Sequence, residues 1–166
     1  ARASDISKAG LLHHYSSKDQ LLAAVLDERD RRTMSRLPDG DKGTEAALDA
    51  WVEIVAHNQR HPDGVALYTA MSAAVIDASH QAYPWFRQHL MATIEYLVDT
   101  LERGKAAGEV HPDAPSEQIA RKLVALSDGL QVQWLCSRAD GGRDVDMHAV
   151  TAGVVSDIKD RWLVRS

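Results

Sequence analysis

Apolar residues recur at intervals of three to four positions along nearly the whole chain, which places them on one face of an α-helix. The clearest example runs through Phe86, Leu90, Ile94, Leu97 and Leu101. No segment alternates apolar and polar residues in the manner of a half-buried strand. The sequence therefore predicts an all-α fold.

Turn-forming residues divide this pattern into segments. The loops at 38–43 and 140–142 interrupt the apolar spacing, and Gly108 is well suited to the left-handed end of a helix. Helices are therefore expected at about residues 18–36, 44–61, 64–78, 85–108, 115–139 and 147–162.

The composition is that of a globular domain. Of 166 residues, 45% are hydrophobic and 26% are charged, which excludes disordered, collagen-like and low-complexity classes. The single cysteine, Cys136, is expected to be a buried small hydrophobe, and the lack of a disulfide partner favours the reducing cytoplasm. No apolar run approaches the roughly 20 residues that span a bilayer, so no membrane partner is expected. The chain opens at Ala1 without an initiator Met, which indicates a fragment of a longer product.

Charge is unevenly distributed along the chain. Residues 1–36 carry a net charge of +2, whereas the remaining residues carry a net charge of −7. The two parts add to the total of −5. A mildly basic end on an acidic body is suited to bringing one end of the protein to a polyanion.

The basic end has the features of a DNA-reading helix. A short helix is expected from Ser7 to Tyr15, preceded by a turn at Asp5 and led by small and basic residues. Small residues allow close backbone approach in the major groove, and the helix dipole favours phosphate. Lys18, in the first turn of the next helix, is placed to neutralise a backbone phosphate.

Residues 6–22, Ile-Ser-Lys-Ala-Gly-Leu-Leu-His-His-Tyr-Ser-Ser-Lys-Asp-Gln-Leu-Leu, resemble the TetR/AcrR family of transcriptional regulators. Segments 101–110 and 126–130 are similar to stretches common in the C-terminal domain of that family. The resemblance implies a TetR-like fold in which residues 1–37 hold the C-terminal part of a helix-turn-helix domain and the connecting helix. Residues 44–166 would then form a ligand-binding and dimerisation domain. The first helix and most of the second helix of the DNA-binding domain are absent from the sequence.

The resemblance also implies which residues contact DNA. These are Ser7, Lys8, Gly10, Leu12, His13, His14 and Lys18. The chain departs from many family members at Gly10, where they carry a hydroxyl residue, and at Leu12, where they carry tyrosine. Leu12 can contact a thymine methyl group but cannot hydrogen-bond a base.

Two further sets of residues follow from the expected C-terminal domain. Candidates for an effector pocket are Trp51, Asn58, Tyr68, Met71, Trp85, Gln131 and Trp134, although aromatic residues also dominate ordinary cores. Candidates for a two-fold dimer interface are Leu123, Leu130, Val150, Val154, Ile158 and Trp162, with burial against the body as the alternative. A two-fold dimer would match a palindromic operator in double-stranded DNA.

These features together predict a homodimeric, ligand-responsive repressor that a small molecule releases from DNA, without a cofactor or an enzymatic activity. One alternative is a helical small-molecule-binding protein that does not bind DNA. Another is a metal-dependent helical-bundle enzyme, because His57 and His61 have the i, i+4 spacing of zinc ligands. Asn58 stands where a metalloprotease helix carries its glutamate, so no metal site is expected.

Overall fold

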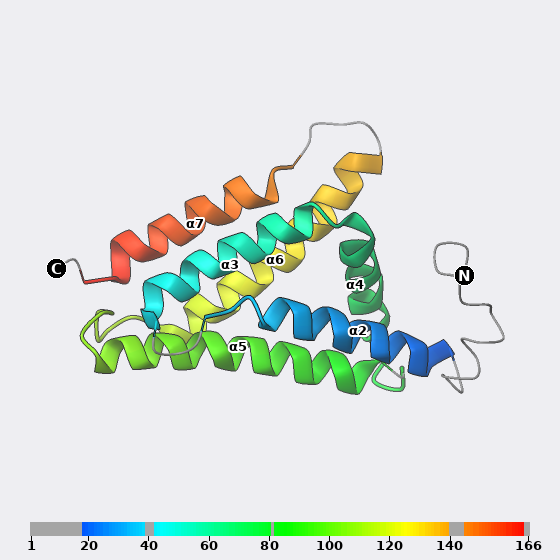
Figure 1. Ribbon diagram of the computed structural model, residues 1–166, viewed down its shortest axis with the longest axis horizontal. Helices are drawn as coiled ribbons and strands as arrows, with labels where there is room; N and C mark the ends of the chain where they lie inside the picture. Colours follow the sequence, from blue (N-terminus) through cyan, green and yellow to red (C-terminus); the bar gives the residue numbers. More distant parts are fainter. Residues whose placement is uncertain (1–17, 39–41, 81, 140–144, 165–166) are drawn as a thin grey trace.

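The computed structural model describes residues 18–38, 42–80, 82–139 and 145–164, which form six α-helices and no strand (Figure 1). The helices are α2 (Lys18–Met34), α3 (Gly43–Gln59), α4 (Pro62–Ala74), α5 (Tyr83–Ala106), α6 (Ser116–Ala139) and α7 (Met147–Trp162). The all-α prediction is confirmed. In the described part of the chain, no helix is both long and apolar enough to cross a membrane.

The main core lies among α3, α5, α6 and α7. The most extensive helix pairs are α3 with α7 and α5 with α6, and the long axes of α5 and α2 run side by side along one edge (Figure 1). Fully buried residues of this core include Leu48, Leu97, Leu101 and Leu123. These four belong to the apolar stripes of their helices, so the three-to-four spacing marks the buried faces.

A smaller core attaches α2 to the body. Leu26 on α2, Tyr68 on α4, and Ala82 and Phe86 at the start of α5 are buried together. The rings of Tyr68 and Phe86 lie 5.1 Å apart between centroids. The position of α2 therefore depends on α4 and α5 rather than on the main core.

Two glycines shape the end of α5. The helix ends at Ala106, and Gly108 follows with a φ of 76°, as the sequence predicts for a left-handed helix end. Gly104 allows α3 to approach closely, because a Cβ there would lie 2.1 Å from Thr44 Oγ1 and 2.6 Å from Val110 Cγ2. The turn after α5 also holds the end of α7, since Val164 N donates to Glu109 O at 2.8 Å.

Two details differ from the sequence-based expectations. Helix α4 begins at Pro62 instead of residue 64, because proline at the first turn of a helix lacks only an N–H that has no helical partner anyway. It ends at Ala74 instead of residue 78, because a run of turns begins at Val75. Cys136 is exposed rather than buried, because it lies on the outward side of α6 while Trp134 faces the core.

Candidate functional site

The residues expected to read DNA are not part of the described structure. Ser7, Lys8, Gly10, Leu12, His13 and His14 lie outside the described residues. Lys18 is the first residue of α2, and its side chain is also outside the description. Their roles remain predictions from the resemblance.

A cavity of about 60 Å³ lies inside the helical body, with walls from α2, α3, α4, α5 and α6. Of the residues predicted to form an effector pocket, Trp51, Asn58, Tyr68 and Gln131 line it. The other three do not. Met71 and Trp85 pack against the small core beside α2, and Trp134 is buried in the main core.

A partly buried group of polar and charged side chains forms one wall of the cavity. The Arg29 guanidinium lies over the Tyr68 ring, 4.5 Å from its centroid. Burial raises the pKa of the Asp128 carboxyl above its ordinary value, although His89, a hydrogen bond with Tyr68 and the Arg29 guanidinium oppose the rise. Burial likewise raises the pKa of Tyr68, with the Asp128 carboxylate adding to the rise. The wall thus presents a guanidinium, a carboxyl group and a phenol to the same small space.

Two polar atoms beside the cavity lack partners within the described structure. Gln131 Oε1 and Thr93 Oγ1 are buried without a hydrogen bond, and both residues line the cavity. Leaving a buried polar group unpaired costs about 1–3 kcal/mol. The cavity exceeds the roughly 10–15 Å³ that a water molecule needs but is smaller than the roughly 300–1,000 Å³ of drug-sized ligand sites. It can hold water or a small fragment as it stands, and a larger ligand requires it to open.

Polar contacts hold α2 against α5 next to this cavity. Asp30 Oδ1 lies 2.8 Å from His89 Nδ1, and Trp85 Nε1 donates to Asp27 Oδ1 at 2.6 Å. The Trp85 and His89 rings stack in parallel, 5.0 Å apart between centroids. His89 therefore takes part both in the lining of the cavity and in the contacts that hold α2 against α5.

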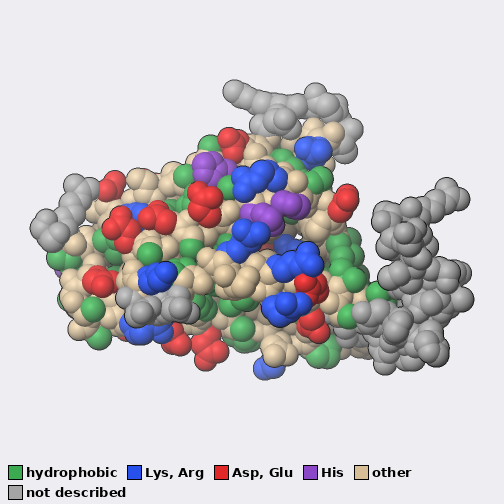
Figure 2. Space-filling view, viewed as in Figure 1, with side chains coloured by type: hydrophobic (Ala, Val, Ile, Leu, Met, Phe, Trp, Pro, Cys, Tyr) green, Lys and Arg blue, Asp and Glu red, His purple; other side chains and the backbone are tan. Residues whose placement is uncertain are grey.

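A second hollow opens to solvent on the outer side of α2. It has a volume of about 630 Å³ and lies between α2 and the corner where α3 passes into α4. Basic and histidine side chains gather on this face, where α2 meets α3 and α4 (Figure 2). We call this hollow the basic cleft. It shares Arg29, Thr33 and Asn58 with the internal cavity, so these side chains form a common wall.

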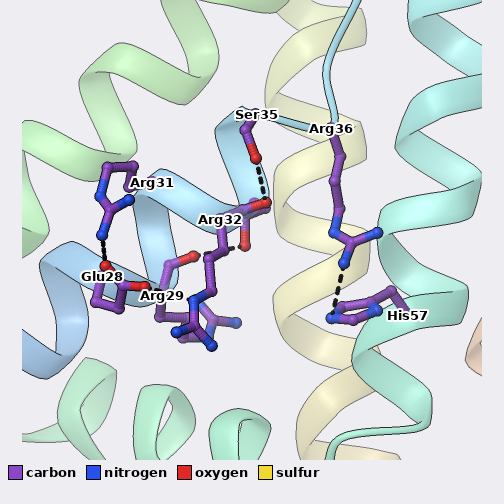
Figure 3. A network of polar contacts seen from close by, with 8 residues as sticks. Glu28, Arg29, Arg31, Arg32, Ser35, Arg36 and His57 are labelled. Carbon is purple, nitrogen blue, oxygen red and sulfur yellow. Dashed lines mark hydrogen bonds and ion pairs between the residues drawn. The ribbon is translucent and has the colours of Figure 1, made fainter.

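The two histidines of the i, i+4 motif lie in the basic cleft. Their rings are 4.0 Å apart between centroids, and His61 Nδ1 donates to the His57 carbonyl oxygen at 2.7 Å. His57 Nε2 faces Arg36 Nη2 at 3.5 Å, as Figure 3 shows. Among the described residues, no group of three or more histidine, cysteine, aspartate or glutamate side chains is arranged to hold a metal ion. Within the described part of the chain, the pair therefore has no third protein ligand of the kind that the enzyme alternative requires.

The predicted dimer-interface residues divide between the core and the surface. Leu123 and Leu130 are 0% and 4% exposed inside the main core, in line with burial against the body, the alternative to an interface. Val154, Ile158 and Trp162 pack partly against that core, and Val150 is exposed. A Cβ added at Gly129 on α6 or Gly153 on α7 would meet no atom within 4 Å. Both glycines therefore lie on open, outward-facing parts of α6 and α7.

Sequence reasoning missed the charged residues of both hollows. Arg29, Arg32 and Arg36 lie in a mixed-charge stretch with no apolar period to orient it. Asp128 carried a usable signal, since it lies between Leu126, which packs against the main core, and Leu130, which is buried in it. A carboxylate in such a position is rarely buried without a partner.

The helical arrangement is that of the TetR family of transcriptional regulators. No protein-family model and no curated protein matches the sequence. Solved structures do match. A TetR transcription regulator from Haloarcula marismortui aligns over 95% of this chain and 81% of its own, with a TM-score of 0.78 and 22% identity.

A TetR transcriptional regulator from Chloroflexus aurantiacus aligns over 99% of this chain and 83% of its own, with a TM-score of 0.76 and 18% identity. GusR of Salmonella enterica aligns over 95% and 80%, with a TM-score of 0.66 and 25% identity. The chain thus has the TetR-like fold, as the sequence predicts.

Proposed function

We propose that this chain is a DNA-binding transcriptional regulator of the TetR type. The observation that carries the proposal is the match of fold to TetR regulators over 95–99% of the chain. The recognition-helix pattern in residues 6–22 supports it independently. In this proposal residues 1–37 belong to the DNA-binding head and its connecting helix, and residues 44–166 form the ligand-binding and dimerisation domain. The protein acts in the cytoplasm.

DNA binding is assigned to the short helix that begins at Ser7. Ser7, Lys8 and Gly10 lead that helix into the major groove, Leu12 and His13 face the bases, and His14 and Lys18 contact phosphates. A gel shift of the full-length protein with its own promoter region tests this assignment. A retarded complex that survives excess nonspecific DNA is expected, and its absence favours the alternative of a helical ligand-binding protein without DNA binding.

The internal cavity is the proposed effector site. Gln131 Oε1 and Thr93 Oγ1 supply unpaired hydrogen-bonding atoms for a ligand, and Trp51 supplies an apolar wall. Arg29 and Thr33 bring α2 into the same wall. A ligand that enlarges the cavity displaces α2, which leads directly to the DNA-binding head, and so releases the repressor from DNA. A coupling of about 1–3 kcal/mol between the two sites is enough for such a response.

Dimerisation is assigned to the outward faces of α6 and α7. These faces carry exposed valines and two glycines whose Cα atoms are open to an approaching helix. A two-fold pair of such faces forms a four-helix contact and places two heads on a palindromic operator. Val150, Val154, Ile158 and Trp162 remain candidates for this contact.

The structural neighbours are transcription regulators rather than enzymes, which favours a regulator over the metal-dependent enzyme. No cofactor is assigned. Metal analysis of the purified protein provides a direct check, because stoichiometric zinc would favour the enzyme alternative instead.

A further inference from the structure

The basic cleft is large enough to be a ligand site in its own right. Its volume of about 630 Å³ lies within the roughly 300–1,000 Å³ of small-molecule sites. The C-terminal half of α2 forms one wall, and the end of α3 with the first turn of α4 forms the other. A molecule bound there therefore touches α2 and the helical body at once.

The cleft concentrates positive charge in a chain whose net charge is −5. Four arginines line it, namely Arg29, Arg32, Arg36 and Arg60. Glu28 and Asp63 are its only carboxylates among the described residues, which leaves a formal charge of +2 with both histidines neutral. The positive charge is therefore not balanced by the protein itself.

Two of the arginines are available to a ligand. Arg32 is occupied, because its Nε donates to Glu28 at 2.5 Å. Within the described ranges, by contrast, Arg36 and Arg60 form no ion pair. Figure 3 shows Arg36 extending from the end of α2 towards His57 on α3. Each guanidinium can bind a phosphate or carboxylate group through two parallel hydrogen bonds.

The pKa of His57 is sensitive to the positive charge of the basic cleft. Its pKa is lowered first by partial burial and then by the positive charges of Arg36, His61 and Arg60. Across the cleft the other charged groups are Arg29, Arg32 and Glu28 from α2 and Asp63 from α4. A bound anion opposes this field and favours the protonated imidazole.

The first turn of α4 adds to the same electrostatic effect. His61, at the N-cap, makes no side-chain hydrogen bond to the turn, and Asp63, Gly64 and Val65 line the cleft. The positive end of the helix dipole therefore points at the same space as the arginines. A metal cation is disfavoured at such a place, and an anion is favoured.

We propose that the basic cleft binds a small organic anion of two or more negative charges, a phosphorylated or polycarboxylate metabolite, with Arg36 and Arg60 as its bidentate partners. The anion bridges α2 to the α3–α4 corner. DNA is the less suitable occupant, because Arg36 follows the end of α2, about 25 Å along the helix from Lys18. The site is separate from the effector cavity, although the two share a wall.

Isothermal titration calorimetry of the full-length protein with sodium pyrophosphate and with sodium citrate tests the proposal, with ionic strength held constant. We expect one site for at least one of the two probes, and the tighter probe assigns phosphate or carboxylate chemistry. Arg36→Gln combined with Arg60→Gln is expected to weaken binding at least about tenfold, since two charge-assisted contacts are lost. Arg87→Gln, an exposed arginine of α5 that does not line the cleft, is the matched control.

A second readout separates a local site from a general charge effect. The probe is expected to raise the His57 pKa, followed by the NMR shift of its ring protons, and to leave the ring-proton signals of His80, which does not line the cleft, unchanged. Circular dichroism verifies that each variant is folded. No binding of either probe, or equal weakening by the Arg87 variant, overturns the proposal.

The outcome does not depend on the proposed DNA-binding function, because calorimetry requires no DNA. If the Arg36 and Arg60 variant instead leaves probe binding intact but weakens binding to an operator duplex, the surface is a DNA-phosphate contact and the proposal fails. If probe binding is lost and operator binding is kept, the proposal holds.

Discussion

Asp30 on α2 and His89 on α5 lie in direct contact, with Asp30 Oδ1 at 2.8 Å from His89 Nδ1. The His89 ring also stacks on Trp85, whose indole nitrogen donates to Asp27 of α2. These contacts connect the helix that leads to the proposed DNA-binding head with α5. Changes at this junction are therefore expected to affect the position of α2 first.

Replacing His89 separates the hydrogen bond from the ring contact. His89→Ala removes both and is expected to lower the free energy of unfolding by about 1–3 kcal/mol, because it leaves Asp30 without its partner. His89→Asn can still donate to Asp30 and is expected to recover part of that loss. Chemical denaturation of both variants measures the difference. Equal stability of the alanine variant and the parent would contradict the role of this contact.

Leu26 and Val25 form a matched pair on α2. Leu26 is 0% exposed in the small core beside Tyr68, whereas Val25 is 43% exposed. Leu26→Ala is expected to cost about 2–5 kcal/mol of unfolding free energy through lost burial and the cavity that remains. Val25→Ala is expected to change it by less than about 0.5 kcal/mol. Thermal and urea unfolding give both values, and similar losses at the two positions would show that α2 is not anchored here.

Asp128 is expected to lower the free energy of unfolding as pH rises, the opposite of a carboxyl group whose pKa is lowered by folding. Because burial raises its pKa in the folded state, the folded protein holds this proton more tightly than the unfolded chain does. The contribution of Asp128 to stability is therefore greatest below its ordinary pKa of 3.8 and falls as pH rises through its raised value.

Asp128→Asn removes that titration. The stability of the variant relative to the parent is expected to increase with pH between about pH 4 and pH 7. Urea unfolding across this range measures it, and Asp99→Asn, at an exposed position on α5, serves as the control. A relative stability that stays flat or falls with pH would contradict a raised pKa at Asp128.

The proposed dimer gives a test at the outward faces of α6 and α7. Val132 and Val150 are 48% and 42% exposed there, and Met91 on α5 is similarly exposed at 44%. Val132→Glu combined with Val150→Glu is expected to convert the dimer to a monomer, because an interface would bury unpaired carboxylates. Met91→Glu is expected to remain dimeric. Light scattering after size exclusion distinguishes them, and a parent that is monomeric at all concentrations would refute this assignment.

Lys18 tests the DNA-binding head. Lys18→Ala is expected to weaken binding to every DNA sequence and to reduce the slope of log affinity against log salt by about one. Fluorescence anisotropy at several salt concentrations measures both quantities. Arg121→Ala, which removes an exposed arginine paired with Glu117 on α6, is expected to leave the slope unchanged. A slope identical to that of the parent would remove Lys18 from the phosphate contacts.

The helices could be predicted because each carries its own signal. The apolar spacing from Phe86 to Leu101 and the glycine that follows α5 are local features, and the structure uses both where expected. The close approach at Gly104 was not foreseen, because its cause, Thr44, lies on another helix.

The hollows could be predicted only in part for the same reason. Trp51 and Tyr68 are conspicuous aromatics, and they do line the internal cavity. Arg29 and Asp128 line the same cavity from two helices far apart in sequence, and no local pattern pairs them. An apolar stripe such as the one through Leu123 and Leu130 predicts a buried face, but it does not show whether the chain itself or a second copy covers that face.

The wall shared by the basic cleft and the internal cavity has a thermodynamic consequence. Arg29, Thr33 and Asn58 border both spaces, so an occupant on one side fixes side chains that an occupant on the other side must also meet. Whatever factor the first ligand imposes on the affinity of the second, the second must impose on the first. The position of α2 would then depend jointly on two chemically unlike molecules, one an anion at the surface and the other enclosed in the cavity.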